Sequence, residues 1–131
     1  MPGWTHLNVK RDVEDLAPKF GHSPELESRF ARVPLELENS GLSYFKVAPG
    51  YRVPFGHRHS EQEEVYLVIS GSARAKVGDD VVELARWDAL RVPPGEWHGL
   101  EAGPEGAEVL ALGAPNTGNK DVEMQPGWWE D

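Results

Sequence analysis

The sequence contains no cysteine, which excludes disulfides, thiolate zinc sites and thiol catalysis. It has no apolar run long enough to cross a membrane, and its first residues have neither the basic start nor the apolar core of a signal peptide. Basic residues are few, because 13 Lys and Arg stand against 22 Asp and Glu, and the net charge of −9 argues against nucleic acid. These absences predict a cytoplasmic protein without nucleic-acid or membrane partners.

Glycine and proline, in contrast, are abundant. The chain of 131 residues has 14 Gly and 11 Pro, which is typical of many short strands joined by tight turns. The clearest hairpin signal is Gly78-Asp79-Asp80, because alternating residues lie on both sides of it. The pattern predicts about eight or nine strands in an all-β sandwich or barrel. The expected strands cover 33–38, 42–48, 65–69, 72–77, 81–85, 89–92, 97–102 and 107–112.

The length allows one domain, which we divide into an N-terminal arm (1–32), a barrel (33–113) and a C-terminal tail (114–131). Two short helices are expected in the arm, one capped by Asp12 and one beginning at Ser23-Pro24. The arm is expected to pack on the barrel or on a second subunit. The tail ends in Trp128-Trp129, which should pack down on a protein surface. The apolar residues of arm and tail predict a homodimer.

Three of the five histidines lie in two short segments. His57 and His59 are separated by one residue, so on a strand they share a face at a Cα spacing of about 6.6 Å and can bind one metal ion. Glu64 begins a strongly apolar strand and is a better ligand than Glu63, which would face the other side of that strand. His98 follows a Pro-Pro-Gly turn and can close the site from across the barrel.

These residues also resemble known motifs. The first segment reads G(X)6HXH(X)4E(X)6G from Gly50 to Gly71, and the second reads PPG(X)2H and ends at His98. They resemble the two motifs of cupins, G(X)5HXH(X)3–4E(X)6G and G(X)5PXG(X)2H(X)3N. This chain has one extra residue before the first histidine, and Trp87 and Ala102 replace the motif's glycine and asparagine. No ligand position is affected. The resemblance implies an antiparallel jelly-roll β-barrel with a metal bound by His57, His59, Glu64 and His98.

Three imidazoles and one carboxylate leave about two of six octahedral positions open, where a substrate and dioxygen or water bind side by side. The donors fit one divalent transition metal, and the sequence leaves open Fe, Mn, Ni, Zn or Cu. We expect a small-molecule ligand in a pocket lined by Phe55, Tyr66, Val68 and Leu100. The favoured function is a metal-dependent dioxygenase acting on a small organic substrate.

Two other functions are kept as hypotheses. A metal-dependent sugar or keto-acid isomerase would need a base near the metal, for which Tyr44, Lys46 and Tyr66 are the candidates. A non-catalytic cupin that binds a metal or a small ligand is the other, since one fold hosts many functions.

Overall fold

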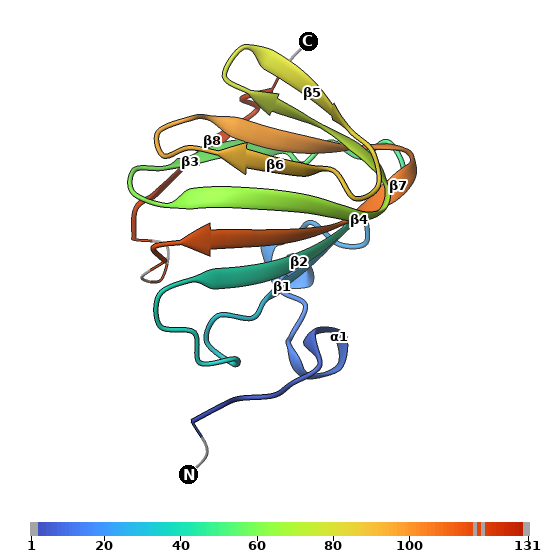
Figure 1. Cartoon of the computed structure of the whole chain (residues 1–131). Helices are drawn as coiled ribbons and strands as arrows, with labels where there is room; N and C mark the ends of the chain where they lie inside the picture. The colour runs from blue at the N-terminus through green and yellow to red at the C-terminus, as the bar shows by residue number, and fades with distance from the viewer. Residues whose placement is uncertain (1–2, 117, 119, 130–131) are drawn as a thin grey trace.

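The computed structural model describes residues 3–116, 118 and 120–129, and within these ranges the chain is mostly β-structure (Figure 1). A helix α1 (Val9–Asp12) and a 3-10 helix η1 (Ala17–Phe20) precede the sheet. The strands are β1 (Leu26–Phe30), β2 (Gly41–Val47), β3 (Phe55–His59), β4 (Glu63–Val77), β5 (Asp80–Leu84), β6 (Ala89–Val92), β7 (His98–Ala114) and β8 (Val122–Pro126). In the part of the chain that is described, no helix is long and apolar enough to cross a membrane.

The two longest strands, β4 and β7, form the frame of the barrel. The first part of β4 pairs with the end of β7, and the last part, Ala73–Val77, pairs with the beginning of β7. Register shifts separate these two stretches, and such irregularities bend a paired ribbon. At the bend Gly71 has a φ of +71°, and a Cβ there would lie 2.0 Å from the carbonyl oxygen of Gly106. Only glycine therefore fits at this position.

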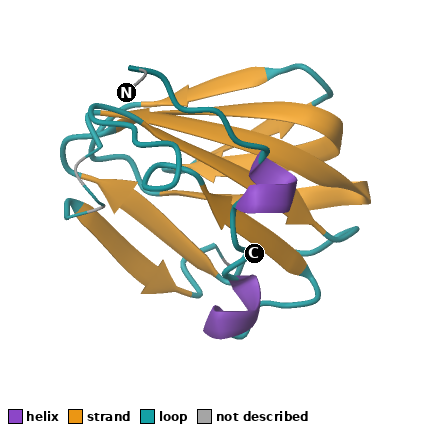
Figure 2. Cartoon of the chain, turned by 90° about the horizontal axis from the view of Figure 1, so that it is seen from below, coloured by secondary structure: helices purple, strands orange, loops and turns teal. Residues whose placement is uncertain are grey.

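The other strands extend this curled ribbon. The sheet runs in the order β1-β2-β7-β3-β8, while β5 and β6 pair with β4, and all pairings are antiparallel. Figure 2 shows the strands curling round the interior, with the short helical segments outside them. The fold is the all-β antiparallel jelly-roll barrel with a short, partly helical N-terminal arm that the sequence predicts.

Alternation along β4 decides what faces the interior. Glu64, Tyr66 and Val68 are buried, whereas Glu63 is exposed and the intervening residues are only half-buried. Glu64 and Tyr66 thus share one face, as the period of two requires. The largest fully buried side chains are Val68, Val92 and Val109, and they pack in one core cluster.

Sequence patterns misjudged several local elements. The expected strand 33–38 is a series of turns, in which Leu35 N donates to Ala31 O and Leu37 N to Arg32 O. Pro34 lies within it, and proline cannot donate to a strand ladder. Strands β4 and β7 also continue, with a bend, through the glycines at which separate strands were expected to end.

The arm differs as well. Asn8, not Asp12, caps α1, because its side chain accepts from the backbone N–H groups of Lys10 and Arg11. The second expected helix is replaced by β1, which pairs with β2 along its whole length. This pairing buries Leu26 and outweighs the local helix-start signal of Ser-Pro.

The tail contains a strand that the sequence analysis did not expect. β8 pairs with β3 from Phe55↔Pro126 to His59↔Val122. Beyond it Trp129 is 6 % exposed, and the Arg52 guanidinium carbon lies 4.3 Å from the centre of a Trp129 ring. The ring of Trp128 stacks on that of Trp97, with 6.4 Å between the centres, so both tryptophans pack down, as expected, on their own barrel.

Candidate metal centre

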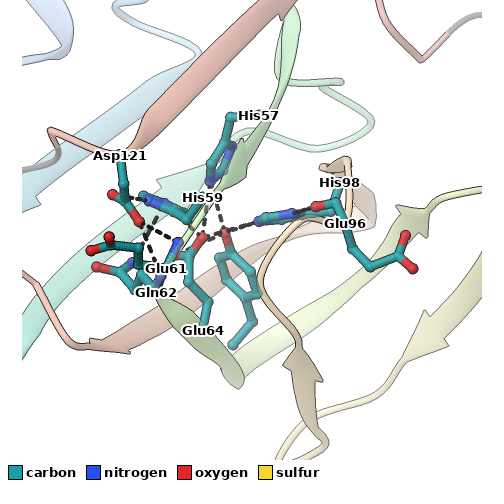
Figure 3. A network of polar contacts seen from close by, with 9 residues as sticks. His57, His59, Glu61, Gln62, Glu64, Glu96, His98 and Asp121 are labelled. Atoms are coloured by element: carbon teal, nitrogen blue, oxygen red, sulfur yellow. Dashed lines mark hydrogen bonds and ion pairs between the residues drawn. The ribbon is translucent and has the colours of Figure 1, made fainter.

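The four predicted ligands meet at one point inside the barrel (Figure 3). Glu64 Oε1 lies 3.1 Å from His57 Nε2, 3.0 Å from His59 Nε2 and 3.1 Å from His98 Nε2. The donors come from three strands, because both members of the histidine pair lie on β3, Glu64 on β4 and His98 on β7. The structure brings the four residues that the sequence predicts as ligands to one carboxylate oxygen.

Strand pairing explains this convergence. His57 and His59 alternate on β3, so both rings face inward and reach the same carboxylate oxygen. His57 is also the direct register partner of His98 on β7, and the centres of these two rings are 4.2 Å apart. On β4 the outward-facing Glu63 instead forms an exposed ion pair with Arg91. Glu64 therefore faces the interior and Glu63 faces solvent, as the alternation of side chains along a strand predicts.

Two further groups fix the orientation of the histidine rings. His59 Nδ1 lies 3.0 Å from Asp121 Oδ1, and the other oxygen of Asp121 accepts from the backbone N–H groups of Glu61 and Gln62. His98 Nδ1 lies 2.9 Å from the carbonyl oxygen of Glu96. A partner on Nδ1 turns Nε2 toward the interior, which is the usual support of a metal-binding histidine.

Sequence reasoning missed Asp121 and Gln62. Asp121 lies in the tail, 62 residues after His59, and no local pattern connects the two. The alternation after it, in Val122–Pro126, was the available signal for a strand beside β3. Gln62 is not among the predicted site residues, but its side chain is buried, with Nε2 at 3.4 Å from His59 Nε2.

Tyr66 lies among the same donors. Its hydroxyl oxygen is 2.9 Å from His98 Nε2 and 3.3 Å from His57 Nε2, and the hydroxyl donates to Glu64 Oε2 at 3.2 Å. Of the other expected pocket residues, Val68 is fully buried in the core, Leu100 packs half-buried against that core, and Phe55 is half-buried beside the ring of His22. Two surface hollows of about 150 and 360 Å³ are lined by none of the predicted ligands or pocket residues.

The charges of the cluster follow from burial and hydrogen bonding. Burial opposes a charge on Glu64, but hydrogen bonds with the three histidines overcome it and lower the pKa of this carboxyl group far below its usual range. Burial lowers the pKa of the His57 imidazole, which favours its neutral form. Burial, followed by the charge of Glu64, raises the pKa of the Tyr66 phenol well above its usual value. For His59, burial acts against protonation, yet the hydrogen bonds with Glu64 and Asp121 raise its pKa.

The arrangement fits a transition metal ion. Two ligand atoms about 2.1 Å from an ion and at right angles to each other are about 3.0 Å apart, close to the distances around Glu64 Oε1. Ligand atoms of His57, Glu64 and His98 all lie within 4.8 Å of one another. Beside His59, the buried Oε1 of Gln62 has no hydrogen-bond partner among the described residues, and an ion or a water molecule at the site would supply one. Three nitrogens and one carboxylate are donors that suit Fe, Mn, Ni, Zn or Cu.

Comparison with known proteins agrees with this fold. A family model described as the cupin domain matches residues 43–113, more than half of the chain. The chain belongs to the cupin family. No curated protein matches this cupin.

Several solved structures resemble this cupin. A cupin protein from Bacteroides fragilis is 21% identical, with a TM-score of 0.72 over 90% of this chain and 89% of that one. Oxalate decarboxylase from Bacillus subtilis is 20% identical, with a TM-score of 0.78 over 96% of this chain but only 32% of its own. Pac13 of Streptomyces, described as a nucleoside dehydratase, is 14% identical, with a TM-score of 0.72 over 92% of this chain and 90% of its own. At these identities the likeness shows the fold alone.

Proposed function

We propose that this cupin is a metal-dependent enzyme that acts on a small organic substrate, with dioxygenase chemistry as the favoured reaction. His57, His59, Glu64 and His98 would hold one divalent transition metal ion. The observation that carries the proposal is the convergence of three imidazole nitrogens on one carboxylate oxygen, at 3.0–3.1 Å, inside the barrel.

The exposed fractions of the ligand side chains indicate from which side a small molecule would reach the proposed metal ion. The His57 side chain is 23% exposed, whereas those of His59 and His98 are 6% and 3% exposed. A small molecule would therefore approach past His57. An ion with these donors supplies Lewis-acid activation or a platform for dioxygen.

An isomerase is the second candidate, because the structure supports one of its requirements. Of the three candidate bases, Tyr44 is engaged elsewhere, since its hydroxyl bonds to Glu108, and Lys46 is exposed on β2. Tyr66 alone of these three contacts the predicted ligands. Relatives described as a decarboxylase and a dehydratase are enzymes of the same fold, which supports catalysis over a purely binding role.

Elemental analysis tests the proposal. Protein purified without a tag or chelator should contain about one transition metal ion per chain, since the donors form one site. His57→Ala and Glu64→Gln should lose the ion. Glu63→Gln is the matched control on the same strand, and it should keep the ion because Glu63 faces solvent.

The metal found then decides the activity assay. Iron or copper calls for oxygen uptake with a panel of small organic acids and phenols, and uptake that His57→Ala abolishes would support the dioxygenase. Isomerisation of sugars or keto acids without oxygen uptake would support the second candidate. Protein that retains no metal even after reconstitution would overturn both and favour the non-catalytic hypothesis for a small ligand.

The homodimer and the cytoplasmic location stay predictions. Light scattering at working concentration tests the first, and a monomeric mass would contradict it.

A further inference from the structure

The phenol of Tyr66 lies where a fifth donor to the proposed ion would lie. Its oxygen is within 3.3 Å of the ligand nitrogens His57 Nε2 and His98 Nε2 and of Oε2, the second oxygen of the Glu64 carboxylate. These separations of 2.9–3.3 Å resemble the 3.0–3.1 Å between Glu64 Oε1 and the histidine nitrogens. The phenol oxygen therefore lies about as far from these three atoms as Glu64 Oε1 lies from the histidine nitrogens.

The surroundings of Tyr66 hold this oxygen in place. The residue follows Glu64 by two positions on the inward face of β4, and its backbone pairs with Leu90 of β6 on one side and Ala111 of β7 on the other. Its side chain is 3% exposed, and its ring meets that of His98 edge-on, with 5.5 Å between the centres. A side chain that is buried in a close-packed interior, on a backbone paired on both sides, has little freedom to swing away.

We propose that the Tyr66 oxygen is a fifth protein ligand of the metal ion held by His57, His59, Glu64 and His98. This inference rests on the proposed metal site and adds a phenolate donor to it. Before metal binding the phenol O–H donates to Glu64 Oε2. With an ion bound, the O–H bond would break as the oxygen–metal bond formed, and the proton would pass to solvent, because a bound cation stabilises the anionic form of its ligand.

A fifth protein ligand would reduce the number of coordination positions that are open to substrate, water or dioxygen. With five protein donors, about one of six octahedral positions stays open instead of two. Substrate and dioxygen would then not both bind the ion, so a dioxygenase reaction would need one of them to react from outside the metal. The Tyr66 phenolate would also be engaged by the ion, so that an isomerase could use it as a base only after it had left the metal.

Iron provides a direct spectroscopic test. Wild type, Tyr66→Phe and Tyr44→Phe are loaded with Fe(II) without oxygen and then oxidised with one equivalent of ferricyanide. Wild type and Tyr44→Phe should show a visible phenolate-to-Fe(III) charge-transfer band and tyrosinate modes in resonance Raman spectra. Tyr66→Phe should lose both at the same iron content. Tyr44 is the control because its hydroxyl bonds to Glu108, away from the site.

Zinc affinity provides a readout that does not depend on iron. In competition with a chromophoric chelator, Tyr66→Phe should bind zinc at least about tenfold more weakly than Tyr44→Phe, since even an outer-shell partner is worth that much. Phenylalanine keeps the ring in the core, so the metal-free variants should unfold at similar temperatures.

Four outcomes would overturn the inference. Wild type with one bound iron but no charge-transfer band would refute phenolate ligation and leave the metal site standing. A band that persists in Tyr66→Phe, or equal zinc affinities, would do the same. Wild type that binds neither iron nor zinc would overturn the proposed metal site and the inference with it.

Discussion

Asp121 provides the sharpest test of how the barrel supports its metal site. One carboxylate oxygen of Asp121 contacts His59 Nδ1, and the other accepts from the backbone N–H groups of Glu61 and Gln62, each at 3.0 Å. Asp121→Asn keeps the shape of the side chain but replaces one acceptor with an NH2 group. That group must face either the His59 N–H or the two backbone donors, so an existing hydrogen bond is lost in both orientations.

The expected effect is a tenfold to hundredfold loss of metal affinity. Outer-shell partners of metal-binding histidines are typically worth about 10–100-fold, or about 1.4–2.7 kcal/mol of binding free energy. The cause is that the His59 ring would no longer be held with Nε2 toward Glu64. The loss should appear in metal binding, while activity per bound metal ion should change less.

Competition titration of zinc against a chelator measures this affinity. Glu123→Gln is the matched control, because Glu123 lies on the same strand β8 but makes an exposed ion pair with Arg58. Nitrogen NMR of the imidazoles supplies a second readout, since His59 should lose its defined Nδ1–H tautomer in Asp121→Asn. An affinity within about twofold of wild type, or an equal loss in Glu123→Gln, would refute the reasoning.

Three further predictions concern stability. Val68→Ala should lower the free energy of unfolding by about 2 kcal/mol, measured by urea denaturation, and leave metal content unchanged, because Val68 is a fully buried core residue. Gly71→Ala should destabilise far more than Gly50→Ala, as compared by thermal unfolding. Both glycines have positive φ, so each substitution strains the backbone. Only at Gly71 would the new Cβ also meet a backbone carbonyl of β7, because nothing lies within 4 Å of the Cβ position at Gly50. Equal losses of stability in the two variants would contradict this prediction. The hydrogen bond from Tyr44 lowers the pKa of Glu108, so this carboxylate stabilises the fold above its unfolded pKa of about 4.3 and ceases to do so as pH falls below its folded pKa. In Glu108→Gln the free energy of unfolding, measured by urea titration, should therefore fall less between about pH 6 and pH 3 than in wild type. An equal fall in both proteins would show that the Tyr44–Glu108 hydrogen bond does not contribute to stability.

The sequence alone determined which residues could form the site. Side chains in a strand alternate with a period of two, so the spacing of His57 and His59 puts them on one face without knowledge of the partners of β3. The same rule chose Glu64 over Glu63 and placed Tyr66 beside Glu64. These inferences succeeded because they depend only on neighbours in the chain.

Errors arose where distant partners decide local structure. The segment of β1 carries a helix-start signal, and it becomes a strand only because β2 lies beside it. Likewise β8 forms against β3 and brings Asp121 to His59. Strand propensity is weak compared with such pairing, so neither segment could be assigned from its own residues.

Only the tertiary structure brings Glu64 to His98. Thirteen residue steps separate Glu64 from Val77, which pairs with His98, and a straight strand of that length would span about 43 Å. The observed separation of Glu64 Oε1 and His98 Nε2 is 3.1 Å. The bend of the β4–β7 ribbon near Gly71 folds its two halves face to face, and this long-range geometry turns four suitable residues into one site.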